Sequence, residues 1–395
     1  MNGSLTRRRF LGASTATLVG GVIGGAVLGG IGGYLLGQSS APSAQPSTVT
    51  VTAARTTTVT QTVTATTDRG LGVKLRTAIV VPGRANDVGW NQQGVEGLRR
   101  AAEKFRADFS FSEGLGYGEG PIRAIQDYIR RDTDLVVAHA GGYRTVVKDI
   151  VSKRQAGNTK FLIVASEVGQ ATPEDLVSGV QATYSFEAAE AAYAAGYLAG
   201  LVTKTKVVGI VQSVESDTYW LRMSGGFAQG LKDANPESKL LFSVVGDYEE
   251  AVKSKEFTLA QIGQRADVIF GLGDGASFGM MEACSERGVW FIDVIGDKRL
   301  IDRAGILLTS VLWDFTPAYE QAIADIYNGT FGKSNYEISF FNRAIDLLQI
   351  NPKVPADIRS AVAEMSEKVR ARQKIVRTVY TPEQFYGLLR ELGFG

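Results

Sequence analysis

Short apolar runs that alternate with amphipathic segments restrict most strongly how this chain can fold. Each run is rich in Val, Ile, Leu or Phe and is bounded by turn residues, which is typical of strands buried on both faces of a parallel sheet. Helical periodicity lies between them, for example over 91–105 and 187–203. Alternating strands and helices predict an open, doubly wound α/β lobe. The expected strands are 77–81, 108–111, 134–138, 160–165, 179–182, 206–211, 239–244, 267–271, 288–294 and 306–311.

These runs form two halves of similar order, which predicts two α/β lobes joined in sequence. We place the N-terminal lobe at 73–186 and the C-terminal lobe, with hinge crossovers, at 187–334. Residues 335–395 are expected to form a C-terminal extension, irregular over 335–348 and helical over 357–370 and 381–393. Ligands of such sheets bind at the carboxyl ends of the strands, so the expected ligand site is a cleft between the lobes.

Composition excludes several classes of protein. The 395 residues include 42 basic and 41 acidic side chains, so the net charge is +1. The chain therefore lacks the excess of positive charge that is typical of nucleic-acid-binding proteins. The single cysteine, Cys284, rules out an intrachain disulfide and a cysteine-based zinc site. A catalytic histidine could only be His139. The motifs taken up below, rather than these counts, lead us to expect no cofactor, no metal and no enzymatic activity.

The N-terminal segments predict export and a membrane tether. Thr6-Arg7-Arg8-Arg9-Phe10-Leu11 resembles a twin-arginine export motif, and a Gly-rich apolar run follows to Gly37. The run is long enough to cross a bilayer core, so 1–37 is expected to be an export segment, cleaved or retained as an anchor. The Ser/Thr-rich stretch 38–72 is expected to be an extended linker, with a marginal Thr/Val hairpin as the alternative. This order places the folded body outside the cytoplasm.

The loop after the first run carries polar groups around an indole. Asn86, Asp87 and Asn91 offer a carboxylate and amides, and Trp90 offers a flat ring. Such a set suits a polar ring-bearing solute that stacks and accepts hydrogen bonds. Asp87 or Asn91 can instead cap the next helix while Trp90 packs inward. Because capping accounts for only one of these residues, we favour ligand binding for all four.

The third run ends at His139, and Tyr143 follows it. The ligand hypothesis places both side chains in the cleft. A neutral histidine that is hydrogen-bonded to a neighbouring strand end is an equally good alternative.

The second half repeats this placement of rings and carboxylates at strand ends. Aromatic residues and acids recur there on both sides, which favours a pocket for a ring that carries hydroxyl or amide groups. The candidate ligand-binding residues in this half are Tyr219, Trp220, Asp274, Asp293 and Trp313.

The loop "GLGDGASFG", residues 271–279, fits two catalytic motifs as well as a binding loop. The nucleophile elbow around Ser277 lacks a histidine later in the chain, so Ser277 is expected to be a cap or hydrogen-bond donor. A dinucleotide fingerprint is supported by Asp293, twenty residues after Gly273. Against it, the Asp274 carboxylate would compete with pyrophosphate at the helix N-terminus. An exported NAD(P)-dependent oxidoreductase is therefore the alternative function.

Several stretches resemble the basic membrane protein family of ABC-transporter solute-binding proteins, which includes purine nucleoside receptors. They include "VPGRANDVGWNQQGVEGL", "DLVVAHAGGY", "ADVIFGLGDGASFGMMEACSERGVWFIDVIGD" and "LLTSVLWDFTPAYEQAI", and the resemblance runs from residue 75 to about 330. It implies a type I periplasmic-binding fold, three hinge crossovers, and closure over a nucleoside-like ligand. It also implies an ABC permease as the membrane partner.

Two positions depart from the family pattern. Met223 stands where a stacking Phe is usual, and Trp313 stands where a ligand-binding Lys is usual. The departures widen the expected ligand to a nucleobase or another small ring compound. The sequence thus predicts an extracytoplasmic solute receptor of an ABC importer, with a ligand sensor of the same body as a further alternative.

Overall fold

The computed structural model of the chain describes residues 74–165 and 172–394. The predicted export segment 1–37 and linker 38–72 lie outside the described residues. Within the described part, no helix is both long and apolar enough to span a membrane.

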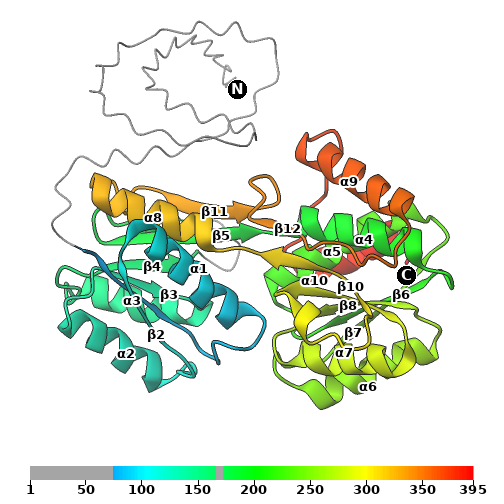
Figure 1. Ribbon diagram of the computed structural model, residues 1–395, viewed down its shortest axis with the longest axis horizontal. Coiled ribbons are helices and arrows are strands. Elements are labelled where there is room, and N and C mark those ends of the chain that lie inside the picture. The colour runs from blue at the N-terminus through cyan, green and yellow to red at the C-terminus, as the bar shows by residue number, and fades with distance from the viewer. Residues whose placement is uncertain (1–73, 166–171, 395) are drawn as a thin grey trace, which may run out of the picture. The chain divides into compact units, whose positions relative to one another are not determined.

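The first lobe is built on a six-stranded parallel sheet. Its strand order is β11-β5-β4-β3-β1-β2. Figure 1 shows α1 and α8 on one face of this sheet and α2 and α3 on the other. The elements are β1 (Arg76–Val80), α1 (Trp90–Phe105), β2 (Asp108–Ser112), α2 (Glu119–Arg130), β3 (Leu135–Ala138), α3 (Arg144–Ser152), β4 (Lys160–Val164), β5 (Gln181–Glu187), α8 (Thr316–Asn328) and β11 (Asn335–Ser339).

The second lobe repeats this order as β12-β10-β9-β8-β6-β7, with β12 antiparallel to β10. Helices α4 and α5 lie on one face of its sheet and α6 and α7 on the other (Figure 1). The elements are α4 (Ala189–Val202), β6 (Val207–Gln212), α5 (Thr218–Ala234), β7 (Lys239–Val244), α6 (Ala251–Gly263), β8 (Val268–Leu272), α7 (Ala276–Arg287), β9 (Trp290–Ile295), β10 (Leu307–Trp313), β12 (Ile345–Leu347), α9 (Ala356–Arg370) and α10 (Pro382–Glu391).

The two matched sheets confirm the predicted α/β class and its doubly wound order. The chain passes between the lobes three times: from β5 to α4, from β10 to α8, and from β11 to β12. These passages agree with the three crossovers that the family resemblance implies.

The lobe boundaries differ from the expected ones at the C-terminal side. Helix α8 packs on α1, and β11 pairs with β5, so residues 316–339 belong to the first lobe rather than to the second. The stretch 335–348, expected to be irregular, supplies one strand to each sheet. The two expected C-terminal helices are α9 and α10, and α10 begins at a side-chain cap: the Thr381 hydroxyl accepts a hydrogen bond from the Gln384 amide at 3.2 Å.

Close packing of α4 against α5 forms much of the second lobe's core. The α4 sequence, AEAAYAAGYLAGLV, is apolar on nearly all sides, as expected for a helix that is covered all round. Glycines on α5 allow the two backbones to touch. A Cβ at Gly226 or Gly230 would collide with the carbonyl oxygen of Ala189 or Tyr193.

We predict that Gly230→Ala destabilises the protein by about 1–3 kcal/mol, since neither backbone can move without disturbing the core. Chemical denaturation measures the change. Gly387→Ala is the matched control, because a Cβ there meets only the end of the flexible Arg390 side chain, 4.0 Å away. Equal stabilities of the two variants would contradict the packing account.

Candidate functional site

Asp87 and Asn91, after β1, are both used to build the start of α1. The Asp87 carboxylate accepts hydrogen bonds from the backbone amides of Gly89 (2.9 Å), Asn91 (3.0 Å) and Gln92 (3.0 Å). The Asn91 side chain donates to Asp87 at 2.6 Å and accepts from the Gly83 amide at 3.1 Å. Asp87 therefore caps the helix, as the sequence allowed for one of these residues, and Asn91 holds Asp87 in place and ties it to the loop at Gly83. Asn86 is exposed in the same loop.

His139 lies in the core, and its predicted ligand role does not fit this position. Its Nδ1 lies 2.6 Å from the Tyr184 hydroxyl and 2.9 Å from the Tyr319 hydroxyl, and its Nε2 lies 3.0 Å from the Trp90 carbonyl oxygen. The residue has no exposed surface. Burial lowers its pKa to about 3, so the ring is neutral at ordinary pH. Both ring nitrogens are occupied, which gives His139 the structural role that the sequence had left open.

Tyr143 is buried as well. Its hydroxyl donates to the carbonyl oxygen of Gly116 at 2.7 Å, and its ring packs in the core beneath α2 and α3. In this structure the side chain is therefore directed into the first lobe rather than toward the second.

Aromatic rings gather where the chain crosses between the lobes. Trp90 stacks on His139 with ring centres 4.2 Å apart and donates from Nε1 to the His139 carbonyl oxygen at 2.9 Å. Phe186, at the end of β5, lies 4.1 Å from Tyr219 and 4.8 Å from Trp313 between ring centres. The structure thus brings together Trp90, Tyr219 and Trp313, three of the predicted residues.

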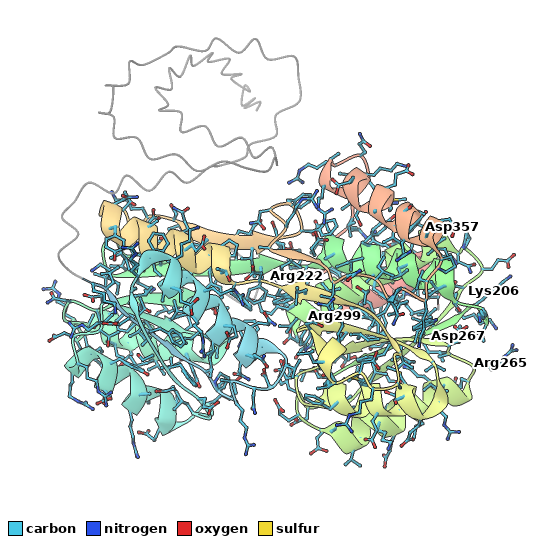
Figure 2. The ribbon with its side chains drawn as sticks, viewed as in Figure 1. Lys206, Arg222, Arg265, Asp267, Arg299 and Asp357 are labelled. Carbon is cyan, nitrogen blue, oxygen red and sulfur yellow. The ribbon has the colours of Figure 1, made fainter. Side chains whose placement is uncertain are left out.

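Arg222, from α5, lies near these rings and is labelled in Figure 2. Its guanidinium lies over the Tyr219 ring and pairs with Glu187 at the end of β5. Trp220, by contrast, packs in the core of the second lobe, as does Met223.

The carboxyl ends of β1 and β9 bring the two lobes into direct contact. A Cβ at Gly296 would collide with the carbonyl oxygen of Val88, so only glycine fits there. The backbone has positive φ angles on both sides of this contact, 53° at Val88 and 66° at Ile295. Ile295 is the central residue of a γ-turn, in which the Gly296 amide donates to the Val294 carbonyl oxygen at 2.7 Å. Positive φ is strained for β-branched residues and is often found at functional sites.

Carboxylates from both lobes lie near this contact, and we call Asp87, Asp217, Glu249 and Asp274 the acidic cluster. Burial raises the pKa of Asp274 to about 8, and the negative charges of Asp87 and Glu249 add to the shift, while Lys298 opposes it. The negative charge of Asp217 also raises the pKa of Asp274. Because Asp87 belongs to the first lobe and the others to the second, the strand ends of both lobes form one electrostatic site.

Two tyrosines stand beside the acidic cluster. Tyr248 donates from its hydroxyl to Asp217 at 2.6 Å. Tyr117, from the loop after β2, is 71% exposed and packs its ring against Gly142. Although the side chain is largely exposed, partial desolvation by the protein around it and then the charges of Asp274 and Glu249 raise the pKa of Tyr117. Tyr117 follows β2 of the first lobe, whereas those acids belong to the second.

Asp293, a predicted ligand-binding residue, is fully buried and paired with Lys298. Burial raises its pKa, and the lysine acts in the opposite direction. One carboxylate oxygen, Oδ1, has no hydrogen-bond partner among the described residues. The Lys298 ammonium also lies 5.5 Å from the centre of the Phe278 ring.

Four residues of the site were not predicted: Tyr117, Asp217, Tyr248 and Glu249. Each follows the carboxyl end of a strand, β2, β6 or β7, so the strand-end rule could have selected them. Those segments lack the close grouping of indole and amide that identified the loop after β1.

The loop after β8 forms neither a nucleophile elbow around Ser277 nor an open phosphate-binding turn for a dinucleotide. The Ser277 hydroxyl donates to the carbonyl oxygen of Asp274 at 2.7 Å, which confirms its predicted role as a hydrogen-bond donor. The Gly275 amide, where a phosphate would bind, is occupied by the Glu249 carboxylate. Within 74–165 and 172–394, no group of three or more His, Cys, Asp or Glu side chains could hold a metal ion.

We predict that Asp274→Asn changes how stability depends on pH. Its pKa is raised from 3.8 to about 8, so the folded state retains a proton that the unfolded chain releases. Its contribution to stability is therefore present below pH 3.8 and is lost as pH rises toward 8. The melting temperature of the variant should rise relative to that of the wild type between these values, by roughly 2–4 °C for each kcal/mol.

Asp297→Asn is the matched control for this measurement. Its hydrogen bond with Arg299 lowers the pKa of Asp297, so its substitution should reduce stability above pH 3.8. A constant difference between Asp274→Asn and the wild type across this range would contradict the assigned pKa.

Comparison with known proteins identifies a family for this architecture. The family model described as "ABC transporter substrate-binding protein PnrA-like" (Bmp) matches residues 74–376. The match includes β11, β12 and α9. It therefore extends beyond residue 330, where the resemblance described in the sequence analysis ends. The family is one of binding proteins, in agreement with the expectation that this chain is not an enzyme.

Individual relatives are distant. The chain is 22% identical over 290 residues to "Transcriptional activator protein med" of Bacillus subtilis, covering 73% of this chain and 87% of that protein. It is 26% identical over 246 residues to "ABC transporter nucleoside-binding protein BmpA" of Lactococcus lactis, covering 58% and 66%. A solved ABC transporter solute-binding protein from Conexibacter woesei shares the fold, with a TM-score of 0.65, 23% identity, and coverage of 77% and 99%.

Proposed function

This chain belongs to the Bmp family of PnrA-like ABC transporter substrate-binding proteins, and we propose that it is the solute receptor of an ABC importer. It acts outside the cytoplasm, tethered by its N-terminal segment, and delivers its ligand to a permease in the membrane. The ligand is a nucleoside-like or other small ring-bearing solute held between the lobes.

The observation that supports this proposal most strongly is the joining of strand ends from both lobes into one site. Asp87 of the first lobe acts electrostatically on Asp274 of the second, and Val88 touches Gly296 across the same boundary. A ligand that contacts both sets of residues favours the closed arrangement, because it gains those contacts only when the lobes meet.

Aromatic residues supply the surfaces for a ring. Tyr219 lies beside Phe186 near a crossover, and Tyr117 is exposed beside the acidic cluster. The BmpA relative is named for nucleoside binding, which supports a nucleoside-like solute here. The departures at Met223, which is buried in the core, and at Trp313 leave room for other ring compounds.

A solute screen tests this function. Thermal unfolding of the protein would be measured with nucleosides, nucleobases, sugars and amino acids. A ligand at about 100 times its Kd should add roughly 2.7 kcal/mol of stability. Stabilisation by none of these classes of solute would count against a receptor role.

Closure itself can be tested at the contact between Val88 and Gly296. Gly296→Ala adds a methyl group that collides with the Val88 carbonyl, so it should hold the lobes apart. The apparent affinity should then fall in proportion to the closed fraction, about tenfold for each 1.4 kcal/mol. Isothermal titration with the solute found in the screen measures this change.

Gly263→Ala is the control for the closure variant, since a Cβ there meets nothing within 4 Å. It should bind as the wild type does. Unchanged affinity in Gly296→Ala would show that the contact is not part of the bound state.

A ligand sensor with the same body is the second candidate, because one relative is named as a transcriptional activator. The two functions differ in the cell. Deletion of a receptor abolishes uptake of the labelled solute, whereas deletion of a sensor leaves uptake intact and changes the transcriptional response to the solute.

A further inference from the structure

The chain after β12 forms a C-terminal segment, residues 356–394, that lies on the second lobe. Its first helix, α9, packs on α4 (Figure 1). The chain that follows runs along α5 toward the N-terminus of that helix, because Lys374 pairs with Asp233 near the end of α5 and Val379 lies against Gly225 in its middle. The segment is therefore anchored to the second lobe along two helices.

The end of α9 contacts the crossover from β11 to β12. Arg370 donates from Nε to the Phe340 carbonyl oxygen at 3.1 Å, and its Cζ lies 3.8 Å from the centre of the Phe340 ring. Arg370 also pairs with Asp346 of β12 at 2.5 Å. Arg372 lies over the neighbouring Phe341 ring, with its Cζ 4.3 Å from the ring centre. Two cations of the segment thus hold the chain at the point where it leaves the first lobe.

The segment also reaches the crossover from β5 to α4. Glu187, the last residue of β5, pairs with Arg222 of α5, so this ion pair joins the two lobes. The Arg222 Cζ lies 4.8 Å from the centre of the Tyr219 ring and 5.7 Å from that of the Tyr380 ring. Only 2% of Arg222 is exposed. Tyr380 therefore helps to exclude water from Arg222, and a charge pair is stronger where water is excluded.

Tyr380 lies beyond residue 376, where the match to the family model ends. The contact with Arg222 therefore belongs to the part of the chain outside that match.

Movement of the lobes requires the crossovers to change conformation. In hinge motions, a few residues at the ends of elements absorb the change in backbone angles. Arg370 and Arg372 belong to the second lobe, whereas Phe340 and Phe341 directly follow β11 of the first. Contacts of this kind are made in one arrangement of the lobes and weakened in others, so they stabilise the arrangement in which they form.

We propose that the C-terminal segment is a hinge clamp: it holds the crossovers at Phe340–Phe341 and at Glu187 and so favours the arrangement in which the strand ends of the two lobes meet. This inference goes beyond the proposed receptor function, because it requires no particular solute. The clamp sets the share of open molecules before any solute binds, and with it the apparent affinity for a solute that closes the lobes. A segment that only stabilised the second lobe would leave that share unchanged.

Spin labels on the two lobes measure the open share in the full-length protein without any solute. Gln126→Cys on α2 and Glu256→Cys on α6 are exposed positions, on helices that lie away from the crossovers (Figure 1), and the native Cys284 is buried. Electron paramagnetic resonance of Arg372→Gln or Tyr380→Ala should show a larger long-distance component. Its ratio to the short-distance component should rise about two- to fivefold, as expected for the loss of one cation–ring contact.

A double variant sharpens the test, since the two contacts lie at separate crossovers but act on one equilibrium. Their effects should multiply, so Arg372→Gln combined with Tyr380→Ala should raise the ratio about five- to thirtyfold over the wild type. Tyr380→Phe keeps the ring beside Arg222 and should give the wild-type distribution.

Lys374→Gln is the matched control, because it also removes a cation from the C-terminal segment. Lys374 pairs with Asp233 and lies 5.5 Å from the centre of the Tyr193 ring, and both partners belong to the second lobe. It should leave the distance distribution unchanged, whatever its effect on the melting temperature. Circular dichroism of every variant verifies that it folds.

The outcomes separate the clamp from the proposed function. An unchanged distribution in the double variant, or a shift to shorter distances, overturns the clamp and leaves the receptor function standing. A rise of the same size in Lys374→Gln also overturns it, because the crossover contacts would then have no special effect. Failure of the solute screen bears on the receptor function alone, since this measurement uses no solute.

Discussion

Apposition of the two sets of strand ends is the constraint on which the site depends. Gly296 lies so close to the Val88 carbonyl that a methyl group does not fit, and a γ-turn at Ile295 fixes the shape of that edge. The Ser310 hydroxyl donates to the Gly296 carbonyl at 2.7 Å and holds the turn against β10. This contact brings carboxylates of separate lobes into range of one another. The raised pKa of Asp274 reflects this proximity.

Hydrophobic periodicity predicted most of the fold because buried parallel strands and amphipathic helices have distinct patterns. The run at 239–244 coincides with β7, and the other predicted strands overlap observed ones. The strands at 335–339 and 345–347 were missed because each depends on pairing with a strand far away in sequence, β5 or β10. Their short lengths leave little local pattern. The lobe boundaries shifted for the same reason, since α8 returns to the first lobe.

Side-chain direction limited the prediction of the site. The strand-end rule selected Asp87, Asp274, Asp293 and Trp313 as candidates, but it could not show which way a side chain points. His139 turns inward because two buried tyrosine hydroxyls and a carbonyl oxygen satisfy its ring nitrogens. Glu249 occupies the N-terminus of α7 only because the loop after β7 folds onto it, a contact that no local pattern encodes.

The distance between the lobes, with and without ligand, tests the central claim that a solute is trapped between them. Spin labels at Gln126→Cys on α2 and Glu256→Cys on α6 report it, because both positions are exposed and the native Cys284 is buried. Electron paramagnetic resonance should show a broad distance distribution that becomes shorter and narrower when the solute identified by titration binds. An unchanged distribution at saturating solute would contradict the account.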